Sequence, residues 1–142
     1  MTITSANSVL MLGVTGLYDT PQQLQGFAQD DAYSMDTVDT AETMIGVDGF
    51  LSAGKVFAVK VMNVTLQADS PSNSFFEDWF QAQESAREVY PAFGIVDQAS
   101  VGRSYTLNNG YLKNYSPMAD AKKVMQPRKF QIHWESAVPA PL

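Results

Sequence analysis

The chain has no cysteine, a single histidine and few charged residues, and each scarcity narrows what it can do. Without cysteine it forms no disulfide and performs no thiolate chemistry, which fits a protein made in a reducing compartment. With His133 as the only histidine, one chain cannot assemble the usual ligand set of a transition-metal site. Charged residues make up 17% of the chain, a low share for a free domain, so we expect other chains to cover part of its surface.

Long apolar runs and recognisable ligand motifs are missing as well. The apolar stretch at residues 9–14 is too short for a signal peptide or a membrane span. Asp30 and Asp31 are neighbours on an expected strand and point to opposite faces, so they cannot share a substrate. The acidic residues between positions 36 and 42 lack the spacing and the glycine of an EF-hand calcium loop. The sequence therefore predicts no catalytic residue, no cofactor-binding residue, no metal site and no membrane anchor.

Positive charge is absent from the first 54 residues, which carry seven acidic residues. Residues 99–142 reverse the balance, and the first, middle and last parts carry −7, −3 and +4 within a net charge of −6. Copies of such a chain can attract one another, the acidic end of one facing the basic end of the next. An acidic part also repels nucleic acid, as the inner wall of a pore for DNA must. A solvated acidic face without any partner is the alternative.

The apolar pattern predicts an antiparallel β protein. The expected strands have β-branched or alternating apolar residues between turn residues, and they cover residues 8–15, 27–38, 41–47, 56–67, 93–97, 103–107, 111–115 and 130–135. Asp48-Gly49 and Asn109-Gly110 are each expected to form a tight hairpin turn. The alternation slips near Val61 and Met62, which predicts a bulge or a sharp twist there. The prolines after residue 137 are expected to end the last strand.

A single helix is expected to begin at Ser74 and to stop at Pro91. Ser74 and Glu77 have the spacing of a capping box. The apolar stripe of this helix is expected to pack onto the sheet as core. Its members are Phe75, Phe76, Trp79, Phe80, Ala86, Val89 and Tyr90.

Residues 27–38 alternate between a bulky face and a small or acidic one. The bulky face carries Phe27, Tyr33 and Met35 and is expected to face the core. The other face suits a smooth solvated surface. Its members include Ala28, Asp30, Ala32, Ser34 and Asp36.

Several segments then occur in a recognisable order. They are Gly26-Phe27-Ala28-Gln29-Asp30-Asp31, Gly46-Val47-Asp48-Gly49, the stretch Gln67-Ala68-Asp69-Ser70-Pro71-Ser72-Asn73 that opens the helix after a long strand, and a closing strand with Trp134. In this order they resemble the tail tube proteins of contractile-tailed bacteriophages, the myophage inner tube, which are related to type VI secretion and pyocin tube proteins. The resemblance covers nearly the whole chain. We therefore expect one domain over residues 1–142, with a short polar N-terminal segment and a proline-containing tail.

This resemblance implies a small β-sandwich or barrel with a flanking helix, six copies of which close a ring around a shared inner β-barrel. Rings stack into a tube inside a contractile sheath, and the tube is the conduit for DNA ejection. The implied partners are other copies of the chain, the tail sheath protein, baseplate and tail terminator proteins, and double-stranded DNA that passes without specific binding. No enzymatic activity and no cofactor are implied. The expected location is the virion, after assembly in the host cytoplasm.

The resemblance and the charge pattern together give the predicted site residues. The predicted lumen-lining residues are Asp30, Ser34, Asp36 and Glu42. Acidic side chains repel the phosphates of DNA, and small side chains keep DNA from sticking. Stacking of neighbouring rings would match acidic with basic residues. The predicted stacking residues are Asp39, Asp48, Lys122, Lys123, Arg128 and Lys129.

A monomeric β-sandwich that binds carbohydrate or protein at a virion or cell surface is the alternative function. Tyr105, Tyr111 and Tyr115 lie close to the expected Asn109-Gly110 turn and could stack on sugar rings. Aromatic residues beside a hairpin more often pack across the strands, however. A tube protein forms rings or polymers and a binding module stays monomeric, so the size of the assembled particle separates the two.

Overall fold

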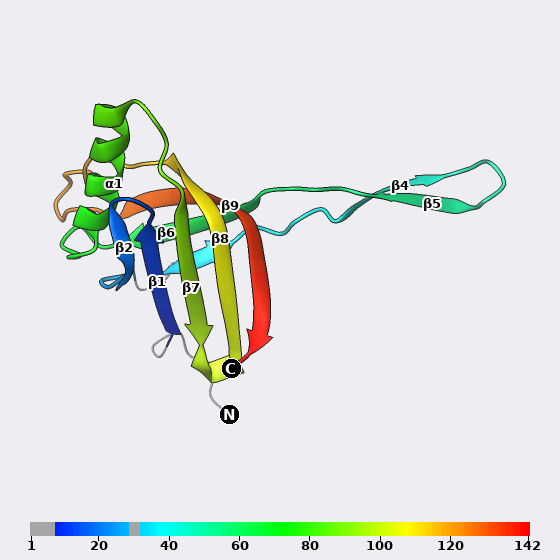
Figure 1. Cartoon of the computed structure of the whole chain (residues 1–142), viewed down its shortest axis with the longest axis horizontal. Helices are drawn as coiled ribbons and strands as arrows, with labels where there is room; N and C mark the ends of the chain where they lie inside the picture. The colour runs from blue at the N-terminus through cyan, green and yellow to red at the C-terminus, as the bar shows by residue number, and fades with distance from the viewer. Residues whose placement is uncertain (1–7, 29–31) are drawn as a thin grey trace.

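The computed structural model describes residues 8–28 and 32–142. Its strands are β1 (Ser8–Val14), β2 (Tyr18–Gln23), β3 (Tyr33–Met35), β4 (Ala41–Ile45), β5 (Leu51–Lys55), β6 (Lys60–Leu66), β7 (Ala92–Gln98), β8 (Arg103–Asn114) and β9 (Arg128–Pro141), the α-helix is α1 (Asn73–Ala86), and a short 3-10 helix covers Ala99–Val101. Seven strands form one antiparallel sheet in the order β2-β1-β7-β8-β9-β6-β3. β4 and β5 form a separate hairpin, the arm, which projects far from the sheet (Figure 1). The predicted fold class, mainly β with one helix, is confirmed.

The seven-stranded sheet curls so that strands distant in its order approach one another. A cavity of about 300 Å³ is lined by residues of β3, β6, β7 and β8. Across it, Gln98 Nε2 at the end of β7 donates a hydrogen bond of 3.3 Å to the hydroxyl of Tyr33 in β3. The curl gives the sheet an inner side, which holds the core, and an outer side.

Helix α1 fills the inner side with the predicted aromatic residues. Phe76 and Trp79 are fully buried, and the ring of Phe76 stacks on Phe130 of β9 with centroids 4.1 Å apart. On the same helix, Asp78 accepts a hydrogen bond from the hydroxyl of Tyr18 in β2. That bond, burial and the nearby negative charge raise the pKa of Tyr18 to about 12. The helix therefore ties β2, at one edge of the sheet, to β9 near the other.

Both predicted ends of the helix are corrected. The capping box does not form, because the helix begins at Asn73 and the hydroxyl of Ser74 donates to the carbonyl of Pro71 at 2.9 Å. At its other end the helix stops at Ala86, since Arg87 takes a left-handed conformation with φ of 57°. Val89, expected in the apolar stripe, therefore lies beyond the helix and is exposed. The chain then turns back over the helix, and the indole Nε1 of Trp79 donates to the carbonyl of Tyr90 at 3.1 Å.

The predicted hairpin at Asn109-Gly110 is wrong, because β8 runs straight through these residues. They form a bulge: Ala92 pairs with Gly110, whereas Gly94 pairs with Leu107, so β8 has one residue more than β7 in this interval. Asn109 takes the positive φ of 51° that such a bulge requires. Gly110 is needed because a Cβ there would lie 2.4 Å from the ring of Trp134.

The end of the chain also departs from the prediction, because β9 continues to Pro141. Leu142 N donates to the carbonyl of Gly102 at 3.0 Å, and the alternation of the ladder then turns the nitrogens of Pro139 and Pro141 away from β8. β6 pairs with β9 only as far as Trp134, so this last stretch is an edge of the sheet, where proline is tolerated.

Two other strand predictions have different outcomes. No bulge occurs near Val61 and Met62, since β6 pairs with β9 in unbroken register from Lys60 to Leu66. The predicted Asp48-Gly49 hairpin is confirmed, although its loop spans residues 46–50 and is longer than a two-residue turn. Gly49 has the positive φ, 85°, that the turn requires.

Candidate functional site: the polar sheet face and the arm

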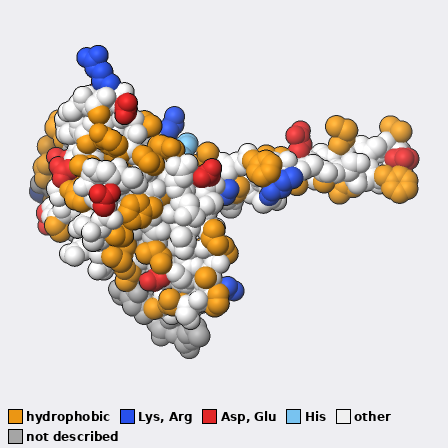
Figure 2. All heavy atoms as spheres, in the orientation of Figure 1, with side chains coloured by type: hydrophobic (Ala, Val, Ile, Leu, Met, Phe, Trp, Pro, Cys, Tyr) orange, Lys and Arg blue, Asp and Glu red, His pale blue; other side chains and the backbone are white. Residues whose placement is uncertain are grey.

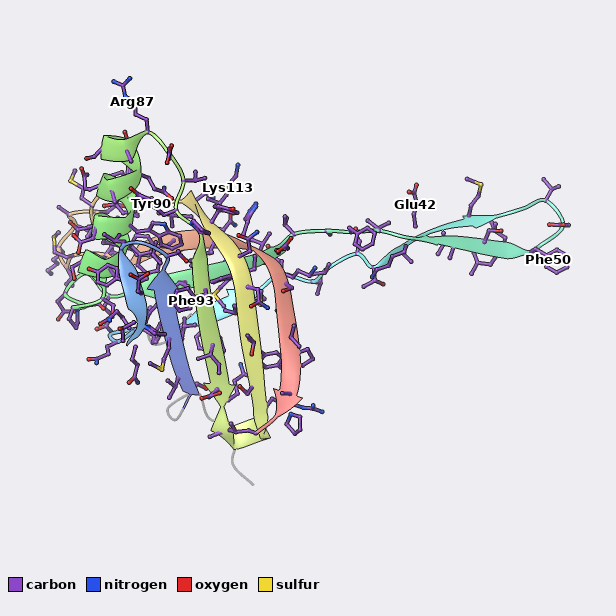
Figure 3. All side chains as sticks on the ribbon, in the orientation of Figure 1. Glu42, Phe50, Arg87, Tyr90, Phe93 and Lys113 are labelled. Carbon is purple, nitrogen blue, oxygen red and sulfur yellow. The ribbon has the colours of Figure 1, made fainter. Side chains whose placement is uncertain are left out.

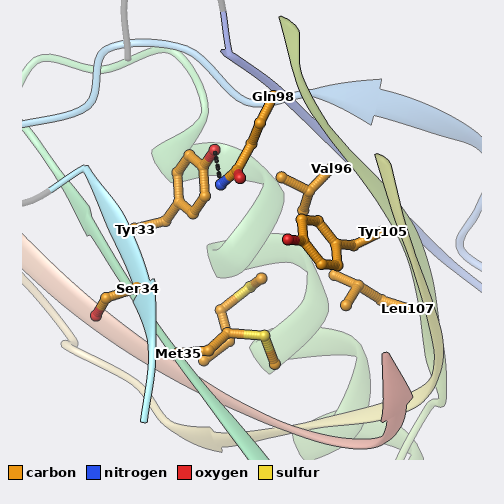
Figure 4. Close-up of a pocket in the computed structure, with 8 residues that line it drawn as sticks. Tyr33, Ser34, Met35, Val96, Gln98, Tyr105 and Leu107 are labelled. Atoms are coloured by element: carbon orange, nitrogen blue, oxygen red, sulfur yellow. Dashed lines mark hydrogen bonds between the residues drawn. The ribbon is translucent and has the colours of Figure 1, made fainter. Parts of the chain in front are cut away.

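The predicted alternation is found at residues 33–36, although Met35, expected in the core, keeps 37% of its surface exposed. Tyr33 and Met35 point into the cavity of the curled sheet, whereas the side chain of Ser34 points away from it (Figure 4). Asp36 follows on the outer side, and its backbone N donates to the carbonyl of Val61 at 3.0 Å. Asp30, also predicted for this face, lies outside the described residues. Ser34 and Asp36 thus lie on the outer side of the sheet, opposite the core.

A chain of side-chain hydrogen bonds, here called the amide ladder, crosses the outer side of the sheet from Asp36. Asn63 Nδ2 of β6 donates to Asp36 Oδ1 at 3.0 Å, and Gln131 Nε2 of β9 donates to Asn63 Oδ1 at 3.1 Å. Asn114 Nδ2 of β8 donates to Gln131 Oε1 at 2.9 Å. The ladder therefore consists of Asp36, Asn63, Gln131 and Asn114, drawn from four distant parts of the chain.

Strand registers put these side chains together. Asn63 pairs with Gln131, and Gln131 pairs with Asn114, where β8 shifts by one residue. A hollow of about 250 Å³ beside the ladder is lined by Tyr33, Ser34, Asn63, Thr65 and Lys129. The sequence contained a usable signal, because Asn63 alternates with buried Met62 and Val64, but it could not tell which strands are neighbours.

The arm is the second unusual feature of the molecule. Every residue of β4 and β5 is exposed, and neither strand pairs with the sheet (Figures 1 and 2). Phe50 near its tip has 75% of its surface exposed and Phe57 at its base has 91%. The large apolar side chains exposed along the arm and its base are Met44, Ile45, Val47, Phe50, Leu51, Phe57 and Val59. Such a concentration of exposed apolar side chains is typical of a protein–protein contact.

The structure separates Glu42 from Ser34 and Asp36, which were also predicted for the lumen. Glu42 lies on β4, in the half of the arm nearer the sheet but away from the sheet itself (Figure 3). It belongs instead with Asp48 in the arm's loop and with Asp39, which leads into the arm. The two acidic residues among the predicted stacking residues, Asp39 and Asp48, are therefore carried on or next to the projecting arm.

The predicted basic residues are divided among three places. Lys122 and Lys123 are exposed in the loop of residues 115–127. Lys129 is exposed on the outer side of the sheet, beside the amide ladder. Arg128, by contrast, is buried and lies on the opposite side of β9 from Lys129.

Contacts within the subunit occupy the guanidinium of Arg128. Nη1 forms an ion pair of 3.1 Å with Glu77 of α1, and Nη2 donates to the carbonyl of Ser116 at 2.7 Å. The group also lies over the rings of Tyr115 and Phe130, at 5.8 and 5.4 Å from their centroids. Arg128 therefore fastens the 115–127 loop to the helix and offers no free cation to a neighbouring ring, which corrects its place among the stacking residues.

The three tyrosines considered for sugar binding do not form a common platform. Tyr105 lines the inner cavity, and the ring of Tyr115 stacks on Phe80 with centroids 4.4 Å apart. Tyr111 is exposed on the outer side, where it pairs with His133. The aromatic surface that a carbohydrate-binding module needs is therefore not formed by these residues.

Within residues 8–28 and 32–142, no group of three or more His, Cys, Asp or Glu side chains could hold a metal ion. No helix in that same part of the chain is both long and apolar enough to cross a membrane.

Chains from solved contractile injection systems share this fold. One from the cryo-EM structure of the anti-feeding prophage cap (AFP tube terminating cap) has a TM-score of 0.64 and 9% identity, covering 100% of this chain and 93% of that one. One from an extracellular contractile injection system, the PVC sheath-tube complex in its extended state, has a TM-score of 0.64 and 11% identity, covering 99% and 93%. One from the PVC sheath/tube terminator in its extended state has a TM-score of 0.62 and 10% identity, covering 99% and 97%. The fold is that of tube-related proteins of contractile tails, which confirms the resemblance predicted from the sequence.

The sequence itself places the chain in a phage family. A family model described as tail fiber protein gp32 matches residues 1–138, and the chain belongs to this family. No curated protein sequence gives a match.

Proposed function

We propose that this protein is the structural subunit of the inner tube of a contractile phage tail. Six copies close a ring, rings stack into a tube, and the tube conducts DNA during ejection. The observation that carries this proposal is the arm, a hairpin that lacks any packing on its own sheet and exposes a row of large apolar side chains. An isolated two-stranded hairpin is marginally stable at best in water, so the arm needs a partner surface.

A second copy of the chain is the partner that fits best. The arm and the surface of the seven-stranded sheet with its helix, the body, are different surfaces. A contact between them that is not reciprocated is head-to-tail, and such contacts generate rings or helical stacks. The arm carries Glu42 and Asp48, and the body exposes Lys122 and Lys123, which gives the two surfaces opposite charges. A contact between unlike surfaces and the opposite charges of those surfaces are both expected of a subunit that polymerises with itself.

Free edges of the sheet support closure into a ring. β2 and β3 are the two end strands, and the last part of β9, beyond Trp134, lacks a neighbour on its β6 side. Unpaired edges favour association with another strand, and closure into a barrel removes them. Strands of adjacent subunits could therefore form one inner barrel, with the whole chain, residues 1–142, acting as one domain.

The other proposed partners follow from the systems that share the fold. Solved neighbours come from structures described as a sheath-tube complex, a sheath/tube terminator and a baseplate. By analogy, the tube proposed here would contact a sheath protein, a terminator and a baseplate, and would be part of the virion after assembly in the host cytoplasm. Its role would be structural and not enzymatic.

We expect the wild-type protein to form rings or tubes with a central pore as its concentration rises. Sedimentation velocity over a range of concentrations, with negative-stain microscopy of each sample, measures this directly. A strictly monomeric protein throughout would favour the binding module. Filaments without a pore would favour a fibre subunit, the role that the family description names.

Charge reversal in the basic loop should weaken the stacking of rings. Lys122→Glu with Lys123→Glu is expected to raise the concentration needed for tube growth several-fold at low salt. Each exposed ion pair contributes only about 0–1 kcal/mol, but the contacts repeat around a ring, and salt screens them beyond about 8 Å. Light scattering during assembly at low and high salt measures the change.

The matched control is Arg87→Glu with Lys113→Glu, which changes the net charge equally at two other exposed positions (Figure 3). These substitutions should leave tube growth near the wild-type level. Growth of the Lys122/Lys123 variant that equals the control, or that does not respond to salt, would contradict charge matching.

A further inference from the structure

The amide ladder uses its hydrogen-bonding groups on itself. Each of its three amide nitrogens donates to the next oxygen along the outer side of the sheet, and the series ends at the carboxylate of Asp36. Amide N–H groups are among the neutral donors that bind the phosphate oxygens of nucleic acids. In the ladder one donor of each amide is already occupied, and the acceptor at its end is negatively charged.

Charge on this outer side is sparse. Its positions on β6 and on the facing part of β9 are Val61, Asn63, Thr65, Lys129, Gln131 and His133, and Asp36 adjoins them. The one lysine of this stretch, Lys129, is thus balanced by one carboxylate, Asp36. Tight binding of DNA needs several Lys or Arg side chains that neutralise phosphates and release counterions, and this side does not supply them.

The part of the outer side formed by β6 and the paired part of β9 lacks the apolar surface typical of a protein contact, although Tyr111 of β8 is exposed next to it. Within the described residues, none of the exposed large hydrophobic side chains lies on β6 or on the part of β9 that pairs with it. Those side chains are concentrated on the arm and in the 115–127 loop instead. A face that is polar and carries hydrogen bonds between its own side chains is suited to remain in contact with water.

The ladder side chains also cannot turn to the other side of the sheet. Met62 and Val64 flank Asn63, and Phe130 and Ile132 flank Gln131, all buried against the helix or the cavity. A change of register would bury the amides and expose these four side chains. The core therefore holds the ladder on the outer side.

We propose that the amide ladder is the wall of the conduit, and that it lets double-stranded DNA slide because one donor of each amide is already held by the next side chain of the ladder and few cations lie beside it. This inference rests on the proposed tube function, and it names the residues that face the cargo. The wall is mainly neutral amide with a carboxylate at one end, in place of the rings of carboxylates predicted from the sequence. Helix α1, on the opposite side of the sheet, then faces outward.

The absence of cysteine from the chain gives a direct test of where the ladder lies. Asn63→Cys and Gln131→Cys each introduce a unique thiol on the ladder, and Gln81→Cys introduces one on the exposed side of the helix. In assembled tubes, the ladder thiols should react with a small maleimide and be protected at least tenfold from a maleimide carried on a large polymer. The helix thiol should react with both reagents. Equal reaction of the ladder thiols with the large reagent would overturn the proposal.

A second experiment tests adhesion. Asn63→Lys with Gln131→Lys would place about twelve cations in a six-fold ring, enough for many phosphate contacts. Tubes of this variant, assembled with short double-stranded DNA, should retain at least tenfold more nuclease-protected DNA than wild-type tubes. Gln81→Lys with Ser85→Lys adds the same charge to the outer helix, and its tubes should hold only nuclease-sensitive DNA.

The outcomes distinguish failure of the ladder as the wall from failure of the proposed tube function. Wild-type tubes that already retain protected DNA would overturn the low-adhesion wall, as would a ladder variant whose bound DNA is fully nuclease-sensitive. If the lysine variant does not assemble, the cysteine variants still place the ladder. Failure of the wild-type chain to form any tube would count against the proposed function itself.

Discussion

A subunit without its arm is expected to fold normally and to lose assembly completely. Residues 41–55 can be replaced by a short glycine linker, because Val56 N donates to the carbonyl of Thr40 at 3.1 Å and the two ends are therefore close. The arm adds no side chain to the buried core, so the thermal midpoint of the body should change little. Sedimentation velocity should show a monomer at concentrations where the wild-type chain forms tubes.

Point substitutions can separate loss of apolar contacts from loss of the whole segment. Phe50→Ser with Phe57→Ser removes the exposed aromatic side chains near the tip and at the base of the arm. The concentration needed for assembly should rise at least tenfold. Val89→Ser with Val101→Ser removes apolar surface at two exposed positions elsewhere and should leave assembly unchanged. Normal tubes from the armless chain would show that the arm is not the contact that builds the polymer.

The largest expected loss of folding stability follows from Trp79→Ala. Trp79 is fully buried between the helix and the sheet, packs beside Phe75 and Phe76, and donates to the carbonyl of Tyr90. Its truncation should lower the free energy of unfolding by about 3–5 kcal/mol, because it leaves a cavity in the main cluster of the core. Chemical denaturation of the monomeric armless chain measures this without interference from assembly.

Trp79→Phe is the matched control for this core position. It keeps most of the aromatic packing but removes the hydrogen bond to Tyr90, and a loss of about 1 kcal/mol is expected from that bond alone. Equal effects of the Ala and Phe substitutions would contradict the account, because they would show that the hydrogen bond and not the packing anchors the helix.

Local patterns in the sequence predicted the parts of this structure that depend on local chemistry. The alternation of Tyr33, Ser34 and Met35 gave the correct sides of β3, and the aromatic stripe gave the buried side of α1. Asn109-Gly110 was misread as a hairpin turn because a bulge uses the same backbone conformations. The difference lies in Trp134, which covers Gly110 from another strand.

The candidate sites depended on information that local patterns do not carry. The ladder residues 36, 63, 114 and 131 meet through the registers of strands far apart in the sequence. The sequence around Arg128 is typical of a surface cation, whereas the fold brings Glu77 and Tyr115 against its guanidinium. The arm could be predicted as a hairpin, but its separation from the sheet could not, since its apolar residues are typical of a buried strand as well.

The central claim is that this chain builds a tube whose passage is walled by the amide ladder. A helical cryo-EM reconstruction of the assembled wild-type protein tests it most directly. The account predicts stacked rings around a pore, with Asn63 and Gln131 facing the pore, α1 on the outside and each arm lying against a neighbouring subunit. A tube with α1 or the cavity of Tyr33 and Met35 turned to the pore, or with arms free in solvent, would contradict it.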